Sequence, residues 1–196
     1  MLWQLFLKGG VAMYLLLAVS VWGLYLVIYK FLYLKLEHGK ITHTLAKAKS
    51  HFSKHGKEET LDHLHTQKGL LNHLFYDALK SWDVKEVASH ELLKLERNLN
   101  ILSTIITAAP MIGLFGTVMG LIRIFGVVSG GTMGDPSLLA GGISEVLIAT
   151  VAGLIIAIVF MFPYQLLAHR TDVFILDTQH ALNDFLDFCH AKEGVK

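Results

Sequence analysis

This chain has a single cysteine, almost no net charge and hardly any charged residues between Ile101 and Ala168. The lone Cys189 excludes a framework of intramolecular disulfides. A formal net charge of +1 gives no overall attraction to nucleic acid, so no nucleic-acid partner is expected. From Ile101 to Ala168 only Arg123, Asp135 and Glu145 are charged, and so long an apolar stretch is not typical of a soluble domain.

Three uncharged runs dominate what is present, in a chain that is 53% hydrophobic. They are Gly9–Tyr29, Ile101–Ile122 and Val146–Ala168, and each is long enough to cross roughly 30 Å of hydrocarbon as a helix. The first run is too long for the apolar part of a signal peptide and lacks a positively charged start, so we expect it to be retained as a span. These runs predict an all-α membrane protein with three transmembrane helices.

The distribution of Lys and Arg predicts the orientation. Positive charges follow the first run and precede the second: Lys30, Lys35, Lys40, Lys47, Lys49, Lys85, Lys94 and Arg97. The loop between the second and third runs, 126–137, has none. Positive loops stay in the cytoplasm, so we expect an N-out, C-in protein of the cell inner membrane whose soluble part is mainly cytoplasmic.

Four segments follow along the chain. Residues 1–33 are expected to form an outer interfacial segment and the first transmembrane helix, and 34–97 a cytoplasmic helical segment. Residues 98–168 hold the second and third transmembrane helices, and 169–196 a cytoplasmic C-terminal helix. Long helices are therefore expected to extend from the membrane into the cytoplasm.

Glycines predict where the cytoplasmic segment breaks, at Gly39, Gly56 and Gly69. Asp83 and Glu86 resemble the start of a helix, with Asp in place of the usual Ser or Thr. Because no breaker follows before the second span, one helix of about 45 residues is predicted, roughly 65 Å long. The third span is expected to continue as a helix in the same way, and both extensions to pack against residues 34–97.

Eight histidines lie between His38 and His90. His51 and His55 are one helical turn apart, which is a spacing that can ligate a metal. His63 and His65 form a second, less suitable pair, and no cysteine accompanies them. A solvated polar face is therefore favoured over a metal site, and neither a metal nor a cofactor is expected.

Small residues recur on one face of the second and third spans. Gly113, Thr117 and Gly120 are spaced i, i+4, i+7, and Gly142, Glu145, Ala149 and Ala152 form a similar stripe. Small residues let membrane helices approach closely, and a threonine among them can hydrogen-bond across helices or line a narrow wet path. The residues assigned to helix packing are Gly113, Gly116, Gly120, Gly142, Ala149 and Gly153.

A hairpin turning near Met133–Gly134 brings residues whose numbers sum to about 267 to the same depth. Thr117 then lies level with Thr150, and Arg123 with Glu145. The threonines would form a hydroxyl layer within the bilayer, either as packing bonds or as part of a pathway. The charges would form a pair within or between subunits, which lowers the cost of placing each in the membrane. Periodicity leaves pathway and packing roles open.

Two motifs resemble the signature of the MotA/TolQ/ExbB proton-channel family. They are Ala109-Pro110-x-x-Gly-Leu-Phe-Gly-Thr-Val-x-Gly-Leu-Ile and Gly142-Ile-Ser-Glu-Val-Leu-Ile-Ala-Thr-Val-Ala-Gly-Leu. The likeness extends from Leu95 to Tyr164, in the expected order and spans. A single span before the cytoplasmic segment is similar to ExbB and TolQ rather than to the four-span flagellar MotA.

The resemblance implies a homopentamer around the single-span helices of an ExbD- or TolR-like partner, whose membrane Asp carries the proton. It also implies that Thr117, Thr150 and Glu145 line the ion pathway. Proton flow along this pathway would then drive work on a TonB- or TolA-like protein. The alternative is a membrane scaffold that stabilises a partner without ion flux. An enzyme is not expected, because no nucleophile–base pair or metal set is present.

Overall fold

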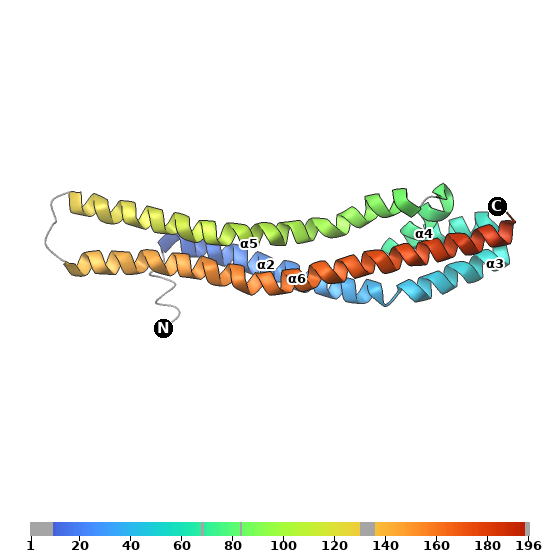
Figure 1. Ribbon diagram of the computed structural model, residues 1–196, viewed down its shortest axis with the longest axis horizontal. Helices are drawn as coiled ribbons and strands as arrows, with labels where there is room; N and C mark the ends of the chain where they lie inside the picture. Colours follow the sequence, from blue (N-terminus) through green and yellow to red (C-terminus); the bar gives the residue numbers. More distant parts are fainter. Residues whose placement is uncertain (1–9, 68, 83, 130–135, 195–196) are drawn as a thin grey trace. The chain divides into compact units, whose positions relative to one another are not determined.

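The computed structural model describes residues 10–67, 69–82, 84–129 and 136–194; within these, the side chains of 85–94, 96–97, 127–129, 136–140, 145 and 193 are not described. Apart from short turns, the described residues form α-helices (Figure 1). Its elements are α2 (Gly10–His38), α3 (Ile41–Thr66), α4 (Leu70–Ser81), α5 (Val84–Ser129) and α6 (Pro136–Glu193).

Three of these helices are long and apolar enough to cross a membrane. They are α2, α5 and α6, whose spanning portions contain long windows of high mean hydropathy and few charges. The predicted class, an all-α membrane protein with three spanning helices, is confirmed. The orientation, N-out and C-in, stays a prediction.

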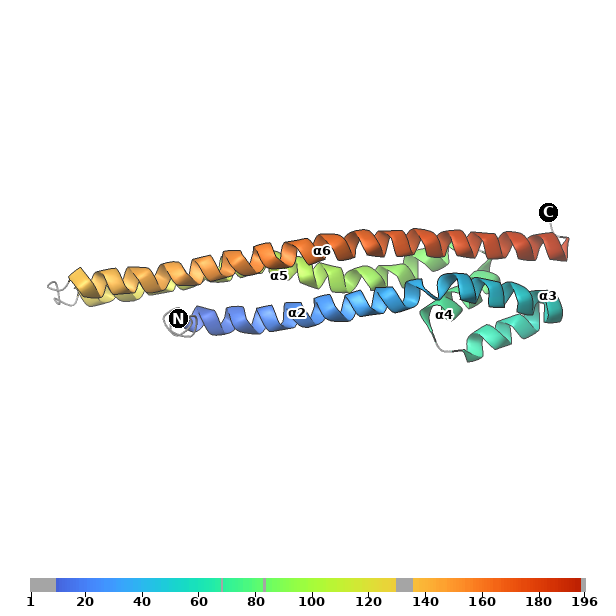
Figure 2. The same ribbon diagram turned by 90° about the horizontal axis from the view of Figure 1, so that it is seen from below.

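The glycine breaks are confirmed at all three positions. α2 ends one residue before Gly39, and α4 begins one residue after Gly69, whose φ is 150°. Gly56 has a φ of 79° inside α3, a value that side-chain-bearing residues rarely adopt. The chain reverses there, so that α3 is a helical hairpin in which the segment after Gly56 returns along the segment before it (Figure 2).

The two long helices are also confirmed. α5 has 46 residues and continues through Pro110, and α6 has 58 residues and continues through Pro163. The expected interfacial segment, the loop at 130–135 and the helix-start residue Asp83 lie outside the described residues.

The chain divides into two compact units. We call Met1–Ile28 with Asn100–Leu166 the apolar unit, and Tyr29–Leu99 with Leu167–Lys196 the charged unit. α2, α5 and α6 each contribute to both units. The predicted segment boundaries, after residues 33, 97 and 168, stay predictions.

Phenylalanine side chains form the core of the charged unit. Phe75, Phe174 and Phe185 are fully buried, and the ring of Phe185 meets that of Phe75 edge to face at 5.3 Å between centroids. Phe52 adds a second edge-to-face contact to Phe185 at 6.3 Å. Because Phe52 and Phe75 belong to α3 and α4, the C-terminal part of α6 packs against the 34–97 segment, as predicted.

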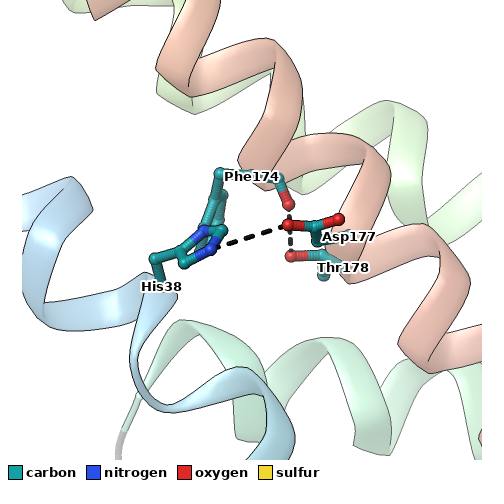
Figure 3. A network of polar contacts seen from close by, with 4 residues as sticks. All are labelled: His38, Phe174, Asp177 and Thr178. Carbon is teal, nitrogen blue, oxygen red and sulfur yellow. Dashed lines mark hydrogen bonds and ion pairs between the residues drawn. The ribbon is translucent and has the colours of Figure 1, made fainter.

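Polar contacts at the rim of the charged unit are weaker. The Nε2 atom of His38 lies 3.6 Å from Oδ2 of Asp177, and the Thr178 hydroxyl donates to the Phe174 carbonyl at 2.7 Å (Figure 3). Both members of the ion pair are about half exposed, so water screens it and it adds little stability. Burial of the aromatic core, not this pair, stabilises the unit.

Candidate functional site

Glycine permits backbone contact between α5 and α6 in the apolar unit. A Cβ atom added at Gly113 would lie 2.8 Å from the carbonyl oxygen of Ala149, and one at Gly153 would lie 2.5 Å from that of Ala109. No side chain fits at those distances, so the two backbones touch. Helices in lipid gain no hydrophobic effect from pairing, and such close approach is how they gain contact energy.

The other small residues extend this contact along the helices. A Cβ at Gly116 would lie 2.6 Å from the Cβ of Ala12 and 3.1 Å from that of Ala149, so α2, α5 and α6 converge there. Nearer the α5–α6 loop, Gly120 approaches the Val146 side chain, and Gly142 approaches that of Ile124. The structure thus places every predicted packing glycine against a neighbouring helix.

Thr117 and Thr150 meet at the centre of this contact. Their hydroxyls hydrogen-bond to each other between α5 and α6. Thr117 also donates to the Gly113 carbonyl at 3.2 Å and approaches that of Val146 at 3.3 Å, while Thr150 reaches the Gly113 carbonyl at 3.3 Å. The two residues lie level with each other, in agreement with the predicted depth. Both hydroxyls are satisfied within one chain.

The threonine pair borders an open apolar face. Leu114 precedes Thr117 by three residues and is 58% exposed, and Leu147 precedes Thr150 by three residues and is 56% exposed. Leu154, four residues after Thr150, is 47% exposed. Residues three or four apart share a helix face, so the half-buried hydroxyls lie beside surface that a second chain or lipid can reach.

Arg123 and Glu145 are level in backbone register. The contacts Gly120–Val146 and Ile124–Gly142 lie on either side of them along the hairpin. Arg123 is exposed, and the Glu145 side chain lies outside the described residues. The predicted charge pair therefore stays a prediction.

Lys30 has a role that the sequence analysis missed. In the sequence Lys30 is one of the positive charges that flank the first span, whereas in the structure its side chain is just 3% exposed. Its Nζ donates a hydrogen bond to the backbone carbonyl of Leu95, which joins α2 to α5 within the charged unit. The neighbouring residues in the sequence do not indicate this burial, since Tyr29 and Phe31 are themselves 46% and 36% exposed.

The histidines gather at the α3 reversal. The ring of His51 stacks on that of His55 at 4.5 Å and on that of His63 at 4.2 Å between centroids, and its Nδ1 lies 3.2 Å from the Thr60 hydroxyl. Burial, followed by repulsion from His63 and His55, lowers the pKa of His51 below its usual 6.5. Within the described residues, no group of three potential ligands is placed to hold a metal ion.

Three spanning helices, glycine-mediated helix contacts and hydroxyls inside the bilayer define a multi-span helical membrane protein. Residues 57–180 match the model of the MotA/TolQ/ExbB proton channel family, which covers more than half of the chain. The chain belongs to this family.

Three relatives illustrate the likeness. A protein of Methanothermobacter thermautotrophicus named as a biopolymer transport protein ExbB homolog is 30% identical over 179 residues, 86% of this chain and 63% of that protein. The Tol-Pal system protein TolQ of Haemophilus influenzae is 34% identical over 102 residues, 52% of this chain and 45% of its own length. The biopolymer transport protein ExbB of Helicobacter pylori is 38% identical over 104 residues, which are 51% of this chain and 68% of that protein. The chain thus spans less than two thirds of the first two relatives.

Proposed function

We propose that this protein is an ExbB/TolQ-type subunit of an ion-driven motor in the inner membrane. Copies of the chain form a ring around single-span helices of an ExbD/TolR-like partner. Proton flow past the threonine pair is coupled to work on a TonB- or TolA-like protein outside the membrane. Family membership and the names of the relatives support this function at the level of a proton-channel subunit.

The observation that carries the proposal is the position of the Thr117 and Thr150 hydroxyls. They are bonded to each other beside an exposed apolar face in the middle of two spans. A hydroxyl donates to an ionised carboxylate and accepts from a protonated one, so it serves both states of a partner's acid without carrying charge. By this proposal the pair exchanges its mutual bond for a bond to the partner carboxylate.

The chain needs a partner for conduction. Apart from Glu145, no residue of the two spans between Ile101 and Ala168 is a carboxylate or a histidine, except Asp135 in the loop. A relay of titratable groups through the bilayer is therefore incomplete in this chain. We place the missing carboxylate on the single-span partner, with Glu145 near the outer entrance.

A membrane scaffold without ion flux is the second candidate, and one observation favours it. The two hydroxyls already satisfy each other in a single chain, as packing residues do. Under this alternative, removing a hydroxyl weakens packing between α5 and α6 and changes no flux.

Proton flux into vesicles containing the complete complex separates the two candidates. We expect Thr150→Val to abolish most of the flux while the complex still assembles, because Val keeps the shape of Thr without its hydroxyl. Thr150→Ser should retain flux.

The matched control for that experiment is Thr178→Val. Thr178 is a buried threonine of the same helix whose hydroxyl donates within its own turn, to the Phe174 carbonyl. Full flux in Thr150→Val would reject the pathway role of this hydroxyl, whereas absence of flux from the unchanged complex would favour the scaffold. Loss of flux in Thr178→Val as well would show that general destabilisation of α6 is responsible.

A further inference from the structure

An apolar groove lies on the surface of the apolar unit, between the start of α2 and the middle of α5, with part of α6 behind it. Its volume is about 460 Å³, and Ala108, Met111, Phe115 and Met119 supply much of its wall. Arg123 also lines it and is the only charged residue among the described residues of its lining. The groove is distinct from the threonine pair, since neither threonine lines it.

The small residues explain why the groove exists and why it is shallow. Gly116 lies against Ala12 and Ala149, so the three helices touch there and form its floor. The outer wall is left open, because Met111 and Phe115 are 69% and 63% exposed. Such a trough on a spanning helix is narrow, apolar and open to the bilayer.

The ends of the groove differ in chemistry. Arg123 is seven residues beyond Gly116 on α5, which is roughly 10 Å along the helix axis. It stands three residues before Gly126, the end of the spanning portion of α5. The deep end of the groove is therefore purely apolar, and the end nearest the membrane surface carries a cation.

We propose that this groove binds one phospholipid, with an acyl chain along α5 and the phosphate at Arg123, and that it prefers an anionic headgroup. An acyl chain matches the apolar trough, and the planar guanidinium matches a phosphate with two parallel hydrogen bonds. Arg123 is exposed and lines the groove, so a headgroup can reach its guanidinium fork. Attraction between juxtamembrane cations and anionic lipid adds the headgroup preference.

The experiment uses the full-length protein, purified as its assembled complex and placed in phosphatidylcholine vesicles with or without phosphatidylglycerol. The probe is phosphatidylglycerol carrying a photoreactive diazirine on one acyl chain, and labelled residues are mapped by mass spectrometry. We expect labelling to concentrate on α5 around Met111 and Phe115. Unlabelled phosphatidylglycerol should compete for it better than phosphatidylcholine does.

Two variants test the assignment of the headgroup. Arg123→Gln should reduce labelling about fivefold, the contribution of one cation to attraction for anionic lipid. Lys35→Gln is the matched control, since Lys35 is an exposed cation in α2 that does not line the groove, and it should label as the unchanged protein does. Ala108→Leu narrows the apolar part and should reduce labelling by every phospholipid.

Three results would overturn the proposal. Equal labelling of Arg123→Gln and the unchanged protein would contradict phosphate binding at Arg123. Labelling spread evenly over the exposed face, including Leu114 and Val118, would mean ordinary bilayer contact. A disulfide between copies formed by Phe115→Cys in high yield would mean that a second copy fills the groove. If Arg123→Gln does not assemble, the lipid competition on the unchanged protein still decides, because equal competition by both lipids contradicts an anionic preference.

Discussion

The apolar unit joins its helices through glycine contacts and hydroxyl bonds, whereas phenylalanine and leucine side chains close the charged unit. In the apolar unit, the large residues Met111, Phe115 and Phe162 point outward and are more than 60% exposed. In the charged unit, Phe174 and Phe185 have no exposed surface. Large apolar side chains thus lie mainly on the outside of the apolar unit, where the buried Phe160 is an exception, and in the core of the charged unit.

We attribute the difference to the solvent that each unit is proposed to meet, which is lipid for the apolar unit and water for the charged unit. In water, burying a large apolar side chain lowers the free energy, so the charged unit places phenylalanine inside. In lipid, that driving force is absent, and close packing and hydrogen bonds between helices remain. Exposed apolar surface on α5 and α6 is therefore expected of helices that face lipid.

The largest effect is expected in the charged unit, from Phe185→Ala. Removing a fully buried ring that contacts both α3 and α4 should destabilise this unit by about 3–5 kcal/mol. Hydrogen exchange of residues 41–81 should accelerate, and that of residues 141–160 should stay unchanged. Leu176→Ala, at a residue 54% exposed, is the control and should change stability by less than about 0.5 kcal/mol. Equal acceleration of hydrogen exchange in both units would contradict the difference in packing between them.

The next effect tests the apolar unit with a single methyl group. Gly153→Ala places a Cβ against the Ala109 carbonyl, and separating the two backbones should cost about 1–3 kcal/mol. Thermal unfolding in detergent measures the loss. Gly141→Ala is the matched control, because no described side chain and no other helix lies within 4 Å of the added Cβ, and alanine favours the helix. An unchanged melting temperature for Gly153→Ala would mean that α5 and α6 do not touch there.

A smaller effect is expected from the threonine pair. A double-mutant cycle with Thr117→Val and Thr150→Val should give a coupling of about 0.6 kcal/mol, which is typical of hydrogen bonds between membrane helices. The free energy of unfolding in detergent is the readout for each variant. Strict additivity of the two changes would contradict the bond between the hydroxyls.

The smallest effect concerns pH in the charged unit. The pKa of His51 is lowered in the fold, so the unfolded chain takes up this proton at a higher pH than the folded chain does. The stabilisation is therefore complete above the usual value of 6.5 and is lost as the pH falls below it. Melting of the charged unit followed from pH 8 to pH 5 should show a decrease that is smaller in His51→Gln; these pH values span about the titration range of histidine. His43→Gln, an exposed histidine on the same helix, should behave as the unchanged protein does.

Local signals in the sequence determined much of this fold. The length of the apolar runs identified the spanning helices, and glycine marked each break; at Gly56 and Gly69 it adopts backbone angles closed to most other residues. The absence of a breaker between Asp83 and Ile101 predicted the continuous α5. The depth of Thr117 relative to Thr150 followed from counting residues away from one short turn.

Only the tertiary structure decided which side chains meet over long separations. The stacking of His63 on His51 required the direction of the reversal at Gly56, and the bond from Lys30 to Leu95 required the placement of α2 beside α5. The groove at Arg123 exists because three helices converge at Gly116, which no periodicity within one helix encodes. Helix propensity and hydropathy act over a few turns, whereas these contacts depend on how separate helices pack.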